Sequence, residues 1–389
     1  MRIAMIGLRG LPATYGGVEK HVEELGARLS ARGHDVTIYC RPSYSTAGVA
    51  VPPEHDYLAP TGRSLGHYRG MTLRTIPTSG GKHLESAVHS GLSAAHTVWS
   101  RSYDVVHFHA MGPGIFSPLP SYLSPSRVVQ TIHALDDQRA KWSPAARLML
   151  RAGRALSTRV PDEVVVVSRD MARIYREEHG REARYIPNGA QHVTPAPPGP
   201  TLARLGLTPG NYVVFLGRLV PEKQPDQLVR AFARVPGATR LVVVGDSSHT
   251  DAFAADLRDL ADLDPRVVLP GYLFGRDLAE VMTSAGVFVQ PSTLEGMPIT
   301  LLEAAAYGRR VVVSDIPPHR EIVGSHAPGH RIVPAASVSA LTDAIVAELS
   351  GDEAGATGAR RLRADVLARY DWDAITDEVL SVYRATLAR

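Results

Sequence analysis

The sequence predicts an α/β fold with two domains, each built on a parallel sheet that helices cover on both faces. Short runs of Val, Ile and Leu alternate along the chain with longer amphipathic runs, as strands and helices do in βαβ units. The short runs are almost continuously apolar, which is typical of strands buried on both faces. A proline-rich segment at 194–200, TPAPPGP, separates two similar halves.

The predicted strands form two series, one in each half. The first comprises Arg2–Gly7, Asp35–Cys40, Asp104–Phe108, Val128–Ile132 and Glu163–Val167. The second comprises Tyr212–Gly217, Arg240–Gly245, Val267–Pro270, Val287–Gln290 and Arg310–Ser314. Helical patterns lie between strands, for example at Val18–Ala31, Pro225–Val235 and Leu278–Ser284. Because the prolines of 194–200 exclude a helix or central strand there, we expect an N-terminal domain over 1–193, a C-terminal domain over 194–370 and a further helix within 371–389.

The composition excludes several classes of protein. Hydrophobic residues make up 44% and charged residues 21% of the 389 residues, so the chain is not disordered, collagen-like or of low complexity. No apolar run is long enough to span a bilayer, and the N-terminal MRIAMIGLRG lacks the apolar stretch of a secretory signal. The single cysteine, Cys40, excludes an internal disulfide framework and fits a reducing compartment. We therefore expect a cytoplasmic protein.

The net charge of +3 conceals an asymmetry between the halves. Residues 1–194 carry 23 Lys and Arg against 16 Asp and Glu, or +7, and the remainder carries −4. Residues Arg139–Arg159 contain six of these cations and no acid. Such a segment is either the solvated face of a helix or a peripheral contact with an anionic membrane, which for a cytoplasmic protein is the inner face. We expect no nucleic acid partner.

A glycine-rich segment, GLRGLPATYGGVEKHVEEL, follows the first predicted strand and leads into a helix. Gly16 and Gly17 come directly before this helix, whose free backbone N–H groups and positive dipole end suit a phosphate. The spacing matches neither GxGxxG nor a Walker motif, which weakens a dinucleotide or P-loop interpretation. A plain glycine-rich turn is the alternative.

Two cations follow the first strand of the second half, in the segment GRLVPEK. Arg218 and Lys223 lie after the strand, where the carboxyl ends of parallel strands face a ligand. An arginine fork and a mobile lysine charge are a common pair for a diphosphate. Each residue alone could equally be a surface charge.

Two carboxylates are separated by eight positions in QPSTLEGMPITLLEAAAYG. Pro298 fits the first turn of a helix, which places Glu295 in the preceding loop and Glu303 just inside the helix. Carboxylates accept hydrogen bonds from vicinal hydroxyls, so the pair suits ribose and sugar recognition. The alternative is two solvated charges at a helix start.

Taken together, GGVE after the first strand, GRLVPEK and the E-x7-E of PSTLEGMPITLLE resemble glycosyltransferase family 4 over nearly the whole chain. The longer segment GLRGLPATYGGVE resembles a subgroup with bacterial rhamnosyltransferases and polysaccharide-assembly enzymes. The family resemblance implies the GT-B fold, with two Rossmann-like domains facing across a cleft. The first domain would bind the acceptor and the second the donor, and the C-terminal helix would cross back to the first.

The resemblance also implies a reaction. A sugar would pass from a nucleotide diphosphate sugar to a hydroxyl of a glycan, lipid-linked or small-molecule acceptor, with retention of anomeric configuration. The family needs no metal or other cofactor. Protein cations would therefore have to stabilise the charge that develops on the leaving diphosphate.

The resemblance assigns roles to individual residues. In the first domain, Gly16 and Gly17 would approach the donor phosphates, and His133, at the end of VVQTIH, would lie beside the donor sugar. A lone histidine at a strand end is otherwise either a core residue or a site residue.

In the second domain, Arg218 and Lys223 would neutralise the diphosphate, Glu295 would contact the hydroxyls of the donor sugar, and Glu303 would contact the ribose. Backbone groups around the start of the following helix would also face phosphate or sugar, in the segment Gly296, Met297, Pro298, Ile299 and Thr300. Catalysis would depend on His133, Arg218, Lys223 and Glu295.

The sequence offers weak metal candidates. His107 and His109 share one face of a predicted strand, because side chains alternate along it. The sequence shows no third ligand, so a position facing the acceptor in the cleft is favoured for this pair. Two D-x-D sequences, at 262–264 and 371–373, do not follow strands, and capping or turn roles suit them better. We predict no metal site.

Two other functions fit the same residues. A nucleotide-sugar 2-epimerase-type isomerase would share the GT-B architecture but would need no acceptor. A non-catalytic nucleotide-sugar-binding subunit would position a partner enzyme, although the intact charged residues argue against decay of an active site. Dependence of the reaction on an acceptor separates a transferase from an isomerase.

Overall fold

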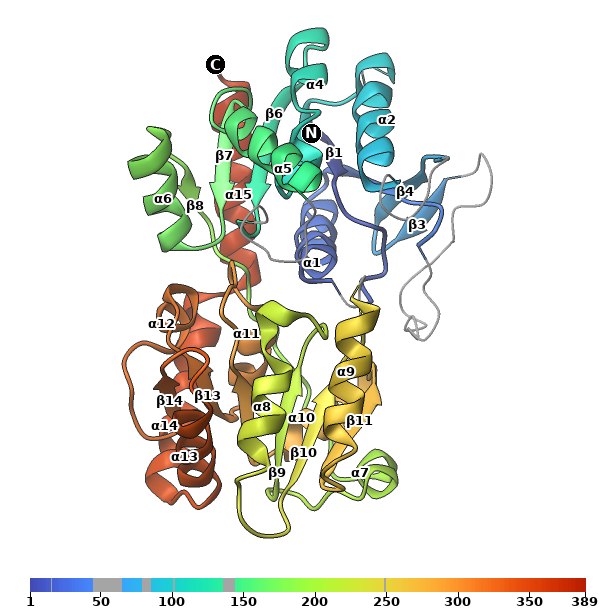
Figure 1. The fold of residues 1–389 in the computed structure, drawn as a ribbon. Helices are drawn as coiled ribbons and strands as arrows, with labels where there is room; N and C mark the ends of the chain where they lie inside the picture. The colour runs from blue at the N-terminus through green and yellow to red at the C-terminus, as the bar shows by residue number, and fades with distance from the viewer. Residues whose placement is uncertain (15, 45–64, 79–84, 101, 136–143, 248–249) are drawn as a thin grey trace. The chain divides into compact units, whose positions relative to one another are not determined.

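The computed structural model describes residues 1–389 except 15, 45–64, 79–84, 101, 136–143 and 248–249. The chain divides into two compact units (Figure 1). Unit 1 comprises Met1–Asn188 and Trp372–Arg389, and unit 2 comprises Gly189–Asp371. The boundaries expected from the sequence, after 193 and after 370, differ from these by five residues and one residue.

Unit 1 is built on an eight-stranded sheet in the order β3-β4-β2-β1-β5-β6-β7-β8. All neighbouring strands are parallel except the hairpin of β3 and β4. The strands are β1 Arg2–Ile6, β2 Asp35–Cys40, β3 Gly66–Tyr68, β4 Met71–Thr75, β5 Val105–His109, β6 Arg127–Ile132, β7 Glu163–Val166 and β8 Arg184–Tyr185. The helices are α1 Gly17–Ala31, α2 Glu85–Ser100, α3 Met111–Gly114, α4 Pro118–Leu123, α5 Pro144–Ser157, α6 Arg169–His179 and α15 Trp372–Leu387.

Unit 2 is built on a six-stranded parallel sheet in the order β11-β10-β9-β12-β13-β14. The strands are β9 Tyr212–Leu216, β10 Arg240–Val244, β11 Val267–Gly271, β12 Val287–Gln290, β13 Arg310–Ser314 and β14 His330–Val333. The helices are α7 Pro200–Leu205, the short 3-10 helix η2 Pro221–Lys223, α8 Pro225–Phe232, α9 Asp251–Ala261, α10 Gly275–Ser284, α11 Ile299–Ala306, α12 Pro317–Val323, α13 Val338–Leu349 and α14 Glu353–Arg369.

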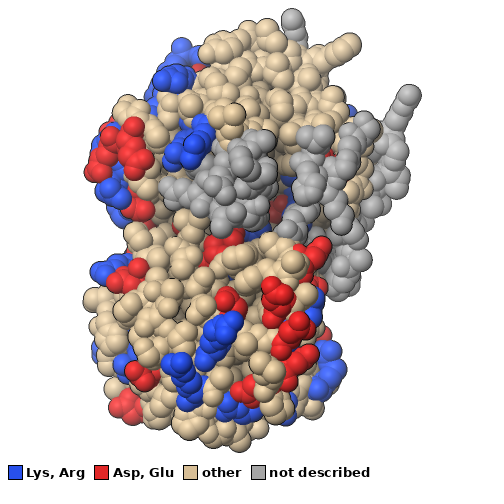
Figure 2. All heavy atoms as spheres, viewed as in Figure 1, with Lys and Arg blue, Asp and Glu red and all other residues tan. Residues whose placement is uncertain are grey.

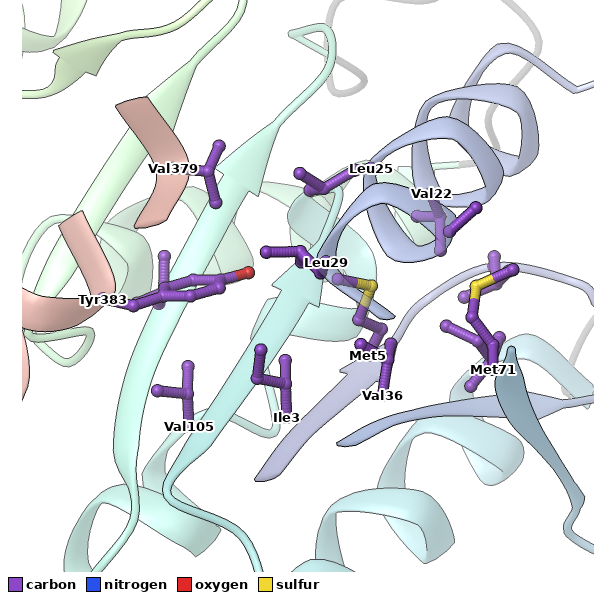
Figure 3. Close-up of a cluster of buried hydrophobic side chains, with 14 of the residues drawn as sticks. Ile3, Met5, Val22, Leu25, Leu29, Val36, Met71, Val105, Val379 and Tyr383 are labelled. Atoms are coloured by element: carbon purple, nitrogen blue, oxygen red, sulfur yellow. The ribbon is translucent and has the colours of Figure 1, made fainter. Parts of the chain in front are cut away.

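The central strands are buried on both faces, as their continuous apolar runs predicted. In β1, Ile3 and Met5 pack into one core, whereas Ala4 and Ile6 pack into another on the opposite face. Figure 3 shows the first of these cores, in which side chains of β1, β2, β4 and β5 meet those of α1 and α15. Tyr383 of α15 is fully buried there. The last helix of the chain is thus part of the core of unit 1.

The ten strands predicted from the sequence are all present. Within the described part of the chain, four further strands were not predicted: β3, β4, β8 and β14. β3 and β8 have only three and two residues. β4 and β14 are as long as predicted strands, but their sequences, MTLRT and HRIV, contain polar residues and lack the apolar runs that marked the others. Because β3, β8 and β14 are outermost strands, their polar side chains reach solvent at the sheet edge.

The proline-rich segment is part of unit 2 and packs against α10. The backbone N–H of Ala196 donates to Thr283 Oγ1 at 3.1 Å, and the N–H groups of Gly199 and Leu202 both donate to Glu280 Oε1 at 2.8 Å. Pro200 opens helix α7, where its fixed φ and missing N–H are tolerated. The expectation that no helix would include this segment is therefore wrong at its last residue.

Acidic side chains gather on unit 2 over α9, on the face that Figure 2 shows. Asp251, Asp256 and Asp259 of this helix are exposed. They contribute to the negative charge that the sequence assigns to the second half.

Candidate functional site

The strands β9 and β12 of unit 2 carry the predicted donor-binding residues at their carboxyl ends. They are parallel neighbours, with Val213 opposite Val287. Their carboxyl ends therefore lie at the same edge of the sheet, where α/β proteins bind ligands. Arg218 follows β9, and Glu295 lies in the loop after β12.

The backbone next to Lys223 has an uncommon conformation. Lys223 ends η2, and the next residue, Gln224, has a left-handed φ of +54° directly before Pro225. This conformation is uncommon for a residue with a side chain and is typical of functional sites. The Lys223 stem crosses Gly217, where an added Cβ would lie 3.0 Å from the lysine Cδ. A glycine at 217 leaves room for the lysine to pass.

Three donors converge on one oxygen of Glu295. Its Oε1 accepts hydrogen bonds from Lys223 Nζ at 2.6 Å, Ser292 Oγ at 2.8 Å and Gln290 Nε2 at 2.9 Å. The side chains of Lys223 and Glu295 are 12% and 11% exposed, so the ion pair is largely shielded from water. No residue that the structure describes donates to Oε2 of Glu295. That oxygen is therefore available to a hydroxyl of a ligand.

The Glu295 carboxyl is held in its ionised form. Burial acts to raise its pKa, but the Lys223 ammonium and its hydrogen bond outweigh burial and lower the pKa to about 2. A carboxylate with so low a pKa is a weak base and a weak nucleophile. It is suited to accept hydrogen bonds from sugar hydroxyls.

Sequence reasoning missed the residues that hold Glu295. Gln290 and Ser292 bind its Oε1, and Ser314 Oγ at the end of β13 donates to the Ser292 carbonyl. His319 of α12 contacts the Ser314 carbonyl through Nδ1 at 2.9 Å and is fully buried. Uncharged polar residues at the ends of apolar strands form no distinctive sequence pattern. Only the parallel pairing of β12 and β13 brings Gln290 and Ser292 close to Ser314.

The start of α11 lies directly after the Glu295 loop. Pro298 is its N-cap residue and Ile299 its first residue, so Glu303 is the fifth helical residue. Pro298 thus lies one residue before the first turn that the sequence predicted for it, and Glu303 lies inside the helix, as expected. Gly296, Met297 and Pro298 are buried, and Ile299 and Thr300 are half-buried. The first N–H groups of a helix lack partners within the helix and are available to phosphate or sugar oxygens.

Buried neutral histidines outside the ion pair predict a loss of stability in acid. Burial lowers the pKa of His319, and likewise that of His89 of α2, from 6.5 to about 4. The unfolded chain therefore binds more protons than the folded chain between pH 6.5 and pH 4, and stability falls as the pH falls through this range. Each histidine contributes a slope of up to about 1.4 kcal/mol per pH unit.

Chemical denaturation at a series of pH values measures this slope. His89 Nε2 lies 2.9 Å from the Cys40 carbonyl. His89→Gln keeps an N–H donor for this carbonyl but does not titrate, so we expect a shallower slope between pH 6.5 and pH 4. An unchanged slope in His89→Gln would contradict the assignment to His89.

In unit 1, the glycine-rich loop is held by acidic side chains of α1. Gly16 is the N-cap of α1, and a Cβ at this position would lie 1.6 Å from the Glu19 carboxylate. The same carboxylate accepts the backbone N–H of Arg9 at 3.0 Å, and Glu23 accepts that of Ala13 at 2.6 Å. Gly16 is thus required for the close approach of Glu19. A phosphate at Gly16 and Gly17 would meet this negative charge unless the Glu19 side chain turned away.

The strand ends of unit 1 bring three histidines together. His109 ends β5, His133 follows β6 directly, and His21 projects from α1. His109 Nδ1 and His133 Nε2 lie 3.2 Å apart. The rings of His21 and His133 are in edge-to-face contact, with 4.7 Å between their centroids. His21 was not singled out from the sequence. Its contact with the strand ends is long-range, and no local pattern predicts it.

His107 and His109 do lie on one face of β5, as alternation predicted. Both are fully buried, and their ring centroids are 4.1 Å apart. His107 is hydrogen-bonded to Tyr383 OH at 2.6 Å and Thr131 Oγ1 at 2.7 Å. A contact of either ring with an acceptor would therefore require this part of unit 1 to open.

His107 and the three histidines near it, His21, His109 and His133, are all neutral at pH 7. Burial lowers the pKa of His21 to about 4 and that of His107 to about 3. The pKa values of His109 and His133 are also well below 6.5, first because of burial and then because of the neighbouring rings. His133 is only half-buried and is the member that a ligand can reach.

Part of the basic segment Arg139–Arg159 lies outside the described residues, since 136–143 are not described. The segment continues in α5, where Arg151 is exposed beside Leu148, which is 70% exposed. Among the described residues, no helix is both long and apolar enough to cross a membrane.

Both halves of the chain match known families. Residues 15–193 match the family Glycosyltransferase Family 4, and residues 210–350 match Glycosyl transferases group 1. The phosphatidyl-myo-inositol mannosyltransferase of Mycobacterium leprae (strain TN) is 29% identical over 403 residues, covering 98% of this chain and 96% of the relative.

Solved structures show the same fold. The sucrose-phosphate synthase of Thermosynechococcus elongatus superimposes with a TM-score of 0.80 at 23% identity, over 100% of this chain and 99% of that one. Anabaena Alr3699/HepE, solved in complex with UDP-glucose, superimposes with a TM-score of 0.79 at 18% identity, over 99% of this chain and 100% of that one. The two parallel-sheet units are thus those of the GT-B fold.

Proposed function

Because the chain belongs to glycosyltransferase family 4 and is a glycosyltransferase, we propose that it transfers a sugar from a nucleotide diphosphate sugar with retention of anomeric configuration and without a metal at the diphosphate. The acceptor is a hydroxyl of a glycan, a lipid-linked molecule or a small molecule. The observation that carries this proposal is the shielded Lys223–Glu295 pair at the carboxyl ends of β9 and β12, directly before the N-terminus of α11.

The cations of unit 2 supply the charge that the leaving diphosphate needs. Lys223 is fixed by η2 and by Glu295, and Arg218 lies on the same loop after β9. A preorganised cation stabilises charge that develops in the transition state without having to reorganise. With Arg218, Lys223 and the backbone groups of 296–300 at the diphosphate, the reaction has protein groups where other transferases use a metal ion.

The charge state of Glu295 supports a mechanism without a glycosyl–enzyme intermediate. A double displacement needs a carboxylate nucleophile close to the anomeric carbon. The Glu295 carboxylate, with its pKa lowered to about 2 and one oxygen occupied by three donors, is poorly suited to that attack. Its role is instead to bind sugar hydroxyls, and the leaving phosphate accepts the proton of the attacking hydroxyl on the same face.

The remaining roles follow the family resemblance. Glu303 binds the ribose hydroxyls, and His133 contacts the transferred sugar through its neutral imidazole. Gly16 and Gly17 approach the donor phosphates once the Glu19 side chain has turned away. The basic segment Arg139–Arg159 contacts anionic lipid headgroups, which places the enzyme at the membrane periphery.

Replacement of Glu303 tests the donor site. We expect Glu303→Ala to weaken binding of the matching nucleoside diphosphate roughly tenfold to a hundredfold, because two hydrogen bonds from ribose hydroxyls to a charged acceptor are lost. Isothermal titration calorimetry measures the dissociation constant directly. Glu353→Ala, which removes an exposed carboxylate of α14, is the matched control and leaves affinity unchanged. Unchanged affinity in Glu303→Ala would contradict the ribose role.

A further inference from the structure

The three-histidine cluster of unit 1, formed by His21, His109 and His133, contains more nitrogen lone pairs than its hydrogen bonds use. His21 Nε2 is buried and has no hydrogen-bond partner among the described residues. His109 Nε2 is also without a partner there, but it is not the ligand atom, since Nδ1 is the His109 nitrogen next to His133. His21 is 2% exposed and His109 fully buried. Unpartnered buried polar atoms cost free energy, so each such atom in a folded protein calls for an explanation.

The hydrogen bond of His21 Nδ1 determines which nitrogen of this ring carries a lone pair. His21 Nδ1 lies 2.9 Å from Asn188 Oδ1. Because an amide oxygen only accepts, Nδ1 carries the hydrogen and Nε2 carries a lone pair. A histidine that donates one N–H to an oxygen and presents the other nitrogen is the usual arrangement of a metal-binding histidine.

The nitrogens are close enough together for small side-chain movements to bring them around one metal ion. One nitrogen from each of His21, His109 and His133 lies within 4.8 Å of the other two. His109 Nδ1 and His133 Nε2 are 3.2 Å apart. Two nitrogens bound to one tetrahedral zinc at about 2.0–2.1 Å lie about 3.4 Å apart, so a metal ion can take the place of the hydrogen bond that joins this pair. The hydrogen of His109 is then on Nε2 and that of His133 on Nδ1.

We propose that His21, His109 and His133 form a binding site for a divalent transition-metal ion of the zinc type. The site supplies three neutral imidazoles from α1, β5 and the residue after β6, held at the carboxyl edge of one sheet. Imidazole ligands select zinc and its neighbours rather than magnesium or calcium, which prefer oxygen. Three protein ligands leave a fourth position for water or another ligand on the half-buried side of His133.

A metal ion bound at this site lowers the transferase activity. A metal on His133 Nε2 occupies the imidazole that the proposed function assigns to the transferred sugar, so zinc inhibits transfer. This inhibitory effect rests on the proposed role of His133. Zinc binding itself does not, because it depends only on the geometry of unit 1.

Cobalt(II) provides a spectroscopic probe of the site that is independent of activity. Titration of the metal-free full-length chain with Co²⁺ is expected to give the strong visible absorption of a four-coordinate ion, saturating at one ion per chain. Zn²⁺ added afterwards abolishes this absorption, and Mg²⁺ does not. Absence of the absorption, or saturation only at several ions per chain, would overturn the proposal.

Two variants and a control locate the ion. His21→Ala removes a ligand, and we expect at least tenfold weaker Zn²⁺ binding by calorimetry. Asn188→Ala leaves all three ligands but removes the partner of His21 Nδ1, and we expect a tenfold to hundredfold loss. His67→Ala removes an exposed histidine of β3 and leaves binding unchanged. If circular dichroism shows that His21→Ala does not fold, the test depends on Asn188→Ala. Unchanged affinity in a folded variant would overturn the proposal.

A transfer assay with graded Zn²⁺ distinguishes this inference from the proposed function. Inhibition over the concentration range in which Zn²⁺ binds, relieved in Asn188→Ala, is the expected result. Zinc binding without inhibition would contradict the role of His133 but not the metal site. Transfer that is insensitive to Zn²⁺ in a chain that binds no Co²⁺ would overturn the metal site and leave the proposed function standing.

Discussion

Lys223→Ala is expected to lower kcat/KM for the nucleotide-sugar donor by roughly a hundredfold to a thousandfold, the effect of removing one preorganised group from a developing negative charge. Lys223 has two functions that a lysine on the protein surface would not have. It supplies a positive charge after β9, and it neutralises Glu295 at 2.6 Å in a largely shielded environment. Steady-state kinetics with varied donor at saturating acceptor measures the loss.

The same substitution should also destabilise unit 2. Removal of one partner of a buried ion pair leaves the other charge unpaired, and about 3 kcal/mol of unfolding free energy is the usual loss. Lys223→Ala/Glu295→Gln removes the orphaned charge as well, so we expect it to regain stability without regaining activity. The matched control is Arg230→Ala, an exposed cation of α8. Full activity in a folded Lys223→Ala would contradict the assignment of Lys223 to the diphosphate.

His133→Ala is expected to lower kcat roughly a hundredfold with little change in the dissociation constant of the nucleoside diphosphate. The ring is the half-buried member of the histidine cluster and is neutral at pH 7, so it can accept a hydrogen bond from a sugar hydroxyl. None of the groups proposed to bind the nucleotide part of the donor is His133, which is assigned to the transferred sugar, so binding of the nucleotide and turnover should separate.

Kinetics and calorimetry on the same preparation test this separation. His67→Ala serves as the control, since it removes an exposed histidine of the same unit. A loss of nucleotide affinity with unchanged kcat would assign His133 to donor binding and contradict its catalytic role. Metal must be chelated in these measurements, so that zinc bound to the remaining histidines does not obscure the result.

The sequence predicted the fold because its buried strands are almost continuously apolar. Ile3 and Met5 enter one core and Ala4 and Ile6 the other, so nearly every residue of β1 is apolar and the strand is easily recognised. The outermost strands β8 and β14 escaped prediction because solvent at the edge admits Arg184 and His330. The packing of the proline-rich segment on Glu280 also escaped it, because that contact joins residues 81 positions apart.

The candidate site could be predicted only where its residues follow one another along the chain. Glu295 and Glu303 share one loop and helix, so their spacing is visible in the sequence. His21 belongs to α1 and meets His133 through the packing of that helix on the sheet, which periodicity does not encode. The sequence therefore offered His107 and His109 as a metal pair without a third ligand, whereas the structure assembles His109 with His21 and His133.

The measurement that tests the central claim most directly is calorimetric titration of the wild-type chain with UDP, GDP, ADP and dTDP in the presence of EDTA. The claim is that the protein cations after β9, Arg218 and Lys223, hold the diphosphate of a sugar donor together with backbone groups after β12. We predict that at least one of these nucleotides binds at one molecule per chain, with the same affinity in EDTA as in Mg²⁺. Binding that disappears in EDTA, or no binding by any of the four, would contradict it.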